Sequence, residues 1–354
     1  MSTRLLICDD SNMARKQVAR SLPDGWDVDI SFAANGAEGI EAIKAGKGDV
    51  LLLDLNMPVM DGYEVLQTIV KEDLPTLTIV ISGDIQPEAH QRVTSLGALD
   101  FIQKPVNKEK LTEILLSYGV FTKEETLTSE QKPEQKRVED VKETHVEVVH
   151  EAVEFEQLDN NLRDCYQEIA NVAMGRAGDL LARLLNVFVM LPIPNVNLIE
   201  VSEINMALSA VNKETTSGVC QGFISSGISG EALLIINDSG FKDIANLMDI
   251  EPPKNENEEL ELLMDMSNVL IGACLKGVSE QLDISFSQGH PVVLGQHRDV
   301  NELITASRKR WQRTLAIEIS YGIEKHPIKC DLLLLFTEQS MKTLNDKLAY
   351  LMDE

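Results

Sequence analysis

The chain has 354 residues, a length that suggests two or three domains and is ample to bury a hydrophobic core. Acidic side chains number 57 and basic ones 32, giving a formal net charge of -25. This excess opposes binding to a phosphate backbone and favours solubility, so we expect no nucleic-acid partner. A DNA-binding regulator is excluded for the same reason, and because the sequence has no basic recognition helix.

The cysteines and the apolar segments favour a cytoplasmic protein. Five scattered cysteines, none in a Cys-x-x-Cys arrangement, indicate neither a zinc site nor a disulfide framework. In the opening stretch MSTRLLICDD, two aspartates end the apolar run within ten residues, so it does not have the pattern of a signal peptide. The stretch LLNVFVMLPIP contains Pro192 and Pro194 and is too short to span a bilayer. We therefore expect no membrane segment.

Residues 1–120 alternate short apolar runs with helical patterns, which favours an α/β domain. The expected strands are RLLICDD (4–10), DVDISFA (27–33), DVLLLDL (49–55), TLTIVISG (76–83) and LDFIQKP (99–105). Segments between them, such as GAEGIEAIKAG, repeat apolar residues every three or four positions. This alternation predicts a doubly wound, five-stranded parallel sheet of the flavodoxin-like kind.

Polar residues follow the strands at their carboxyl ends, where the active sites of parallel sheets lie. Asp9 and Asp10 close the first strand, Asp54 the third and Ser82 the fourth, and Lys104 follows the fifth. Each one alone is as readily a turn or helix-cap residue. Together, three carboxylates at one edge would repel unless a cation lies among them, and their oxygens suit Mg²⁺. A lysine and a serine hydroxyl opposite them suit a phosphoryl group.

With these residues, the first 120 positions resemble the receiver domain of two-component response regulators. The resemblance rests on Asp9-Asp10, the segment LLLDLNMPVMDG, VISGD and Lys104-Pro105. It implies that a sensor histidine kinase phosphorylates Asp54 and that Ser82 and Lys104 contact the phosphoryl group. It also implies an aromatic switch at Phe101, and Mg²⁺ held by Asp10, Asp54 and the Asn56 carbonyl with Asp9 assisting.

A charged connector covers residues 121–154. Its composition shifts to Glu, Lys, Gln and Thr with few large apolar residues, which is typical of a solvated linker. Val138, Val141, Val148 and Ala152 nevertheless fit a heptad that continues to Leu162. A loose or disordered linker and a helix that pairs two chains into a homodimer both remain open.

Residues 155–354 contain an internal repeat. DCYQEIANVAMG (164–175) and ELLMDMSNVLIG (261–272) each place an acid, a second acid, an asparagine and a glycine at steps of four, three and four. These steps put all four positions on one stripe of a helix. Such spacing alone is common by chance, but here it recurs beside β-rich segments. We predict a duplicated α+β domain with a shared central sheet.

This motif resembles the active helices of the CheC/CheX/FliY chemotaxis phosphatases, and the duplication makes it more like CheC or FliY than CheX. The resemblance implies that Asn171 holds a water in line with an aspartyl phosphate, and that Glu168 pairs with the lysine of a partner receiver. Asp265 is one methylene shorter than glutamate, so Asp265 and Asn268 are expected to form a weaker second site.

These observations predict a receiver-regulated phosphatase, a hydrolase acting on phosphorylated CheY-type response regulators in chemotaxis or two-component signalling. In one variant, Asp54 is itself the substrate in cis, and the protein is a self-clearing phosphate sink. The alternative is a non-catalytic docking or flagellar-switch-type binding module that receiver phosphorylation gates.

Overall fold

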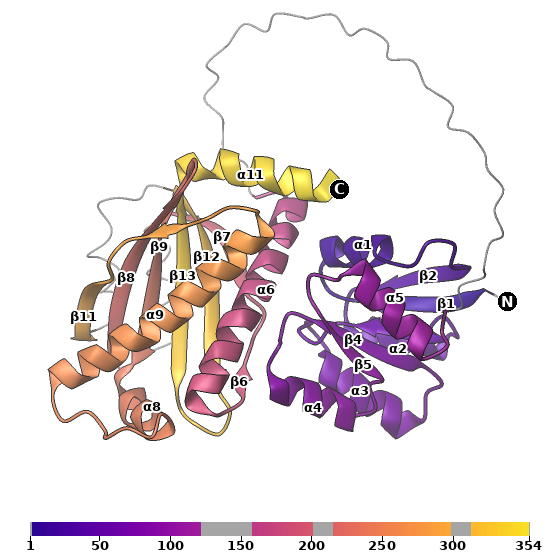
Figure 1. Ribbon diagram of the computed structural model, residues 1–354, viewed down its shortest axis with the longest axis horizontal. Helices are drawn as coiled ribbons and strands as arrows, with labels where there is room; N and C mark the ends of the chain where they lie inside the picture. The colour runs from indigo at the N-terminus through magenta and orange to yellow at the C-terminus, as the bar shows by residue number, and fades with distance from the viewer. Residues whose placement is uncertain (1, 122–157, 201–214, 299–312, 354) are drawn as a thin grey trace, which may run out of the picture.

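The computed structural model describes residues 2–121, 158–200, 215–298 and 313–353. They form an N-terminal domain (residues 2–121) and a C-terminal region (residues 158–353) that lie side by side (Figure 1). The long helix α6 of the C-terminal region faces the N-terminal domain. The connector, with its heptad pattern, lies outside the described residues.

The N-terminal domain is built on one parallel sheet. Its strands are β1 (Thr3–Cys8), β2 (Val28–Ala33), β3 (Val50–Leu53), β4 (Leu77–Ser82) and β5 (Asp100–Gln103). Their spatial order is β2-β1-β3-β4-β5, and every neighbouring pair is parallel. The predicted five-stranded, flavodoxin-like sheet is confirmed.

Helices cover both faces of this sheet because its strands alternate apolar side chains between two cores. Leu5 and Ile7 join the cluster that packs against α1 (Asn12–Arg20) and α5 (Lys108–Ser117). Leu6 and Cys8 join the opposite cluster, against α2 (Gly36–Lys44), α3 (Gly62–Glu72) and α4 (Pro87–Ser95). Burial on both faces explains why the strands read as continuous apolar runs.

The C-terminal region holds an eight-stranded sheet whose pairings are all antiparallel. The main path is β10 (Ser287–Gln288), β8 (Thr216–Ser225), β9 (Ile228–Asn237), β13 (Lys329–Thr337), β12 (Arg313–Ile323) and β6 (Val189–Met190). Off this path, β11 (Val292–Arg298) pairs with β8, and β7 (Asn195–Glu200) pairs with β12. The mixed α/β character is as predicted.

Two helices of 26 residues each, α6 (Asn160–Leu185) and α9 (Glu256–Gln281), supply most of the helical side of the core. They pack so closely that a Cβ on Gly277 would lie 2.6 Å from the Cα of Ala173. The short 3₁₀ helix η1 (Asp238–Gly240), α8 (Phe241–Leu247) and the C-terminal α11 (Glu338–Asp353) complete the helical elements of the described part. By length and composition α9 could cross a membrane, but 61% of its apolar window is buried within the fold.

The strand pairings of the C-terminal region repeat in two halves. The run from α6 to α8 contains β6, β7 and the hairpin β8–β9, and the run from α9 to α11 contains β10, β11 and the hairpin β12–β13. Strands β6 and β7 pair with β12 of the other half, as β10 and β11 pair with β8. The two hairpins meet at β9 and β13, in the middle of the sheet.

Candidate active site

The carboxyl ends of the parallel strands bring three of the predicted side chains into contact. Lys104, after β5, places its Nζ 2.7 Å from Asp9 Oδ2 and 3.1 Å from Asp54 Oδ1. All three side chains are buried. The backbone around Asp54 is also crowded, since a Cβ on Gly62 would lie 2.3 Å from its carbonyl oxygen. This explains the glycine at the end of LLLDLNMPVMDG.

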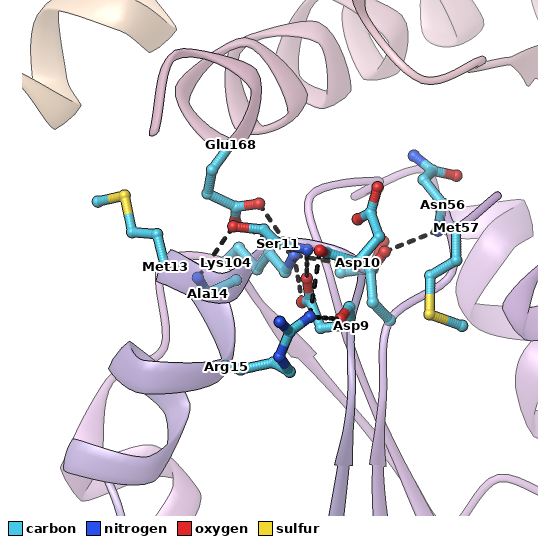
Figure 2. Close-up of polar contacts among 12 residues, drawn as sticks. Asp9, Asp10, Ser11, Met13, Ala14, Arg15, Asn56, Met57, Lys104 and Glu168 are labelled. Carbon is cyan, nitrogen blue, oxygen red and sulfur yellow. Dashed lines mark hydrogen bonds and ion pairs between the residues drawn. The ribbon is translucent and has the colours of Figure 1, made fainter. Parts of the chain in front are cut away.

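A fourth charged group reaches this cluster from the other domain. Glu168 points from α6 toward Lys104, and its Oε1 lies 3.2 Å from the lysine Nζ (Figure 2). One ammonium group is therefore shared by three buried carboxylates. Burial lowers the pKa of Lys104, but Asp54, Asp9 and Glu168 outweigh this effect and hold it well above its ordinary value.

The pKa values of Glu168 and Asp54 are also raised, because one cation cannot neutralise three buried carboxylates. Burial is the largest influence on Glu168; its pKa is raised despite the attraction of Lys104, and Asp9 and Asp54 add to the rise. Burial likewise raises the pKa of Asp54. The cluster therefore has an excess of negative charge that a proton or a second cation would relieve.

Asp10 and Asn56 complete the set predicted to hold Mg²⁺. Asp10 Oδ1 is buried without a hydrogen-bond partner, and burial, with Asp54 and Asp9 nearby, raises the pKa of Asp10 to about 7. The backbone N–H of Asn56 donates a hydrogen bond to Asp54 Oδ2 at 2.9 Å. An unpaired carboxylate oxygen beside a second carboxylate suits a hard cation that retains water.

This donor set is sparse. In the part of the chain that the structure describes, no three His, Cys, Asp or Glu side chains gather closely enough to hold a metal ion. Asp9 is turned toward Lys104 instead. Binding of Mg²⁺ by Asp10, Asp54 and the Asn56 carbonyl, with Asp9 assisting, stays a prediction.

Ser82 and Phe101 lie where the strand pattern placed them. The fully buried Ser82 hydroxyl accepts a hydrogen bond of 3.1 Å from the Asp84 amide. Phe101 is half-buried, with its ring edge-on to His90 at 5.6 Å between centroids. Phosphoryl contact by Ser82 and switching by Phe101 stay predictions.

The whole acid–acid–asparagine–glycine stripe of α6 lies against the N-terminal domain. Asp164 accepts hydrogen bonds from the backbone amides of Asn12 (3.2 Å) and Met13 (2.9 Å), at the start of α1. Four residues on, Glu168 meets Lys104. At Gly175 the approach is closest, because a Cβ there would lie 1.8 Å from the Gly83 carbonyl oxygen.

Asn171 is buried, at 5% exposure, but beneath the other domain rather than beneath its own sheet. Its backbone carbonyl lies 3.1 Å from where a Cβ on Gly83 would stand, beside Ser82. Its side-chain Oδ1 has no hydrogen-bond partner. A buried acceptor left unpaired is costly and is typical of a site that binds something further.

The second stripe has the opposite environment. Glu261, Asp265 and Asn268 are exposed on α9, and a Cβ on Gly272 would meet nothing within 4 Å. The structure does not bring these residues to the strand-end cluster.

A second set of contacts between the two parts was not predicted. The Gln86 side chain donates to the Val189 carbonyl (2.8 Å) and accepts from the Val189 amide (2.9 Å). Arg92 donates twice to Glu324, at 3.1 and 2.8 Å, and its guanidinium lies 3.8 Å from the centre of the Phe188 ring. We call these five residues the α4 clamp. No sequence signal marks them, because the paired residues lie 103 and 232 positions apart in the chain.

Comparison with known proteins agrees with the geometry of the N-terminal domain. The family model for the response regulator receiver domain matches residues 5–116. The chemotaxis protein CheY of Treponema pallidum is 32% identical over 117 residues, which are 32% of this chain and 81% of that protein. The chain belongs to the response regulator receiver family. That assignment rests on about a third of its length.

Two other similarities cover different shares of the chain. A protein-glutamate methylesterase/protein-glutamine glutaminase of Geobacter sulfurreducens is 42% identical over 113 residues, which are 31% of this chain and 30% of the relative. The chain thus spans less than a third of that enzyme's length. The crystal structure of FliY from Thermotoga maritima aligns with 55% of this chain and 98% of its own, at 18% identity and a TM-score of 0.39.

Proposed function

We propose that this protein is a phosphatase that hydrolyses the aspartyl phosphate of CheY-type receiver domains. The observation that carries the proposal is the position of α6 across a receiver's phosphorylation site. Glu168 lies 3.2 Å from Lys104, and Asn171, one turn away, presents a buried and unpaired carboxamide oxygen. In this proposal Asp54 is the residue that a histidine kinase phosphorylates.

The chemistry needs little more than positioning. An acyl phosphate is already activated, so the site has to hold a water in line behind phosphorus. The Asn171 carboxamide can accept a hydrogen bond from that water through Oδ1 and donate one through its amino group, without removing a proton from it. As the water oxygen bonds to phosphorus, the bond from phosphorus to the aspartyl oxygen breaks, which releases a carboxylate and inorganic phosphate.

Glu168 acts through the lysine. Lys104 is the cation available to a phosphoryl group on Asp54, and Glu168 fixes its position and shares its charge. When bound by Asp10, Asp54 and the Asn56 carbonyl, Mg²⁺ would supply the remaining positive charge at the phosphoryl oxygens.

We further propose that the C-terminal region is a duplicated module of the CheC/CheX/FliY kind that acts in the cytoplasm. The shared stripe of α6 and α9 and the matching strand pairings of the two halves support the duplication. In this reading Asp265 and Asn268 form a second, weaker site on an exposed face.

The decisive experiment compares phosphate release by the wild-type protein and by Asn171→Ala. Both are incubated with a separately phosphorylated CheY-type receiver in the presence of Mg²⁺, and Asn268→Ala is the matched control on the exposed stripe. The proposal expects faster loss of phosphate with wild type and a larger defect for Asn171→Ala than for Asn268→Ala. Binding without any change in phosphate lifetime would favour the docking module instead.

A further inference from the structure

We propose that the resident partner of α6 is the receiver of the same chain, and that the α4 clamp selects it over other receivers. This inference rests on the proposed phosphatase function, because it names the substrate of that site as Asp54 in cis. The motif residues alone do not explain selection of this receiver, since Glu168 contacts a lysine that the receiver resemblance expects in other receivers as well. The clamp adds contacts made by the Gln86 and Arg92 side chains of this receiver.

Gln86 provides the first selective contact. It is 1% exposed, and its side-chain amide satisfies both the N–H and the C=O of Val189, as a neighbouring strand would. A receiver without a carboxamide at this place would leave two backbone groups unpaired at a buried edge. Such a loss discriminates strongly between otherwise similar partners.

Arg92 provides the second contact. Its planar guanidinium makes a two-point ion pair with Glu324 while stacking on Phe188. Lysine cannot reproduce both the fork and the stacking. The Glu324 pair also lowers the pKa of that carboxyl, chiefly through its hydrogen bond with Arg92.

The clamp and the motif hold the receiver at separate points. Asp164 binds the start of α1, Glu168 meets Lys104 in the middle, and the clamp holds the loop before α4 and α4 itself. Because both partners belong to one chain, each contact forms at the effective concentration of a tethered pair. With Gly175 against Gly83, a second receiver can reach the same stripe only after the first has separated from it.

Charge reversal of the clamp tests the inference. The full-length protein is phosphorylated with acetyl phosphate and Mg²⁺, the donor is removed, and decay of the Asp54 phosphate is followed for wild type, Arg92→Glu, Glu324→Arg and the double variant. Each single reversal is expected to lengthen the lifetime about fivefold, as the loss of a partly exposed pair predicts. The double variant restores opposite charges and is expected to recover most of the wild-type rate.

Two further readouts separate the possible results. Opening the clamp frees α6, so each single reversal is also expected to speed dephosphorylation of a CheY-type receiver added in trans. In wild type, the rate of Asp54 dephosphorylation is expected to be independent of protein concentration. A rate that rises with concentration would overturn the inference, because Asp54 would then be reached from a second molecule.

The inference and the proposed function fail in different ways. If Asn171→Ala prolongs the Asp54 phosphate but clamp reversal does not, the phosphatase stands and selection by the clamp is wrong. If Asn171→Ala leaves both the cis and the trans lifetimes unchanged, the phosphatase proposal is wrong and the inference falls with it.

Discussion

A single methyl group at position 175 should separate the two domains. Gly175→Ala would place a Cβ 1.8 Å from the carbonyl oxygen of Gly83, 2.5 Å from its carbonyl carbon and 3.1 Å from the Asp84 nitrogen. All three are backbone atoms, so no side chain can rotate out of the way. The same substitution at the equivalent place on α9, Gly272→Ala, meets nothing within 4 Å.

The expected size of the effect follows from these distances. To turn a 1.8 Å approach into an ordinary contact of 3.4 Å, the helix and the receiver must part by about 1.6 Å. A shift of that size would take Glu168 out of range of Lys104, which is now 3.2 Å away. Overpacking of this kind costs about 1–3 kcal/mol, enough to shift the docking equilibrium by about fivefold to 150-fold.

Amide hydrogen exchange measures this directly. The Val189 amide donates to Gln86 and the Met13 amide donates to Asp164, so both report on docking rather than on the fold of either part. We expect faster exchange at both amides in Gly175→Ala. In Gly272→Ala, exchange at these two amides should be unchanged. Replacing glycine with alanine stabilises either helix by about 1 kcal/mol, so this gain is common to the two variants. Wild-type protection in Gly175→Ala would refute the docking geometry.

Three further predictions follow from individual contacts. Asp164→Ala removes the carboxylate that receives the first amides of α1 and should weaken docking by about 1 kcal/mol, seen as faster exchange at Asn12 and Met13. His297, with Nδ1 2.9 Å from Asp238 and Nε2 3.1 Å from Glu259, has a raised pKa, chiefly through its hydrogen bond with Asp238. Its stabilisation is complete below about pH 6.5 and fades as pH rises through the higher pKa of the folded state, so His297→Gln should lower Tm at pH 5.5 and change it little at pH 9. Leu270→Ala empties a fully buried position of α9 and should cost about 2–5 kcal/mol in chemical denaturation, whereas Val292→Ala, at an exposed position, should cost little.

The N-terminal fold could be predicted from the sequence because its signals are local. Each strand is a short apolar run, and the polar residues that matter follow those runs directly, as Asp54 follows β3 and Lys104 follows β5. A parallel sheet then brings them to one edge whatever the details of the helices. Contacts of a few ångströms, such as Lys104 to Asp9, follow from topology.

The contacts between the two parts could not be predicted in this way. Arg92 and Glu324 are separated by 232 positions, and neither differs from any surface ion-pair residue until the surfaces meet. The spacing of the α6 motif indicated a helical stripe, but not that its own receiver would cover it. Gly175 carried the only hint, since a glycine on a stripe permits a close backbone approach.

The clamp, unlike the motif, has no counterpart beside α9 among the residues that the structure describes, as the proposed selection of α6 requires. Val189 pairs with Ile323, and Glu324 follows directly; in the other half Ser287 pairs with Ile224, and Ser225 follows. The residue equivalent to Glu324 in the half that contains α9 is therefore Ser225, which has no carboxylate to pair with Arg92. The residue before β10 is again aromatic, Phe286, but its ring packs edge-on against Phe223 at 5.2 Å. A receiver placed on α9 would lose both the ion pair and the stacking, so α6 retains its own receiver while the matching stripe on α9 stays exposed.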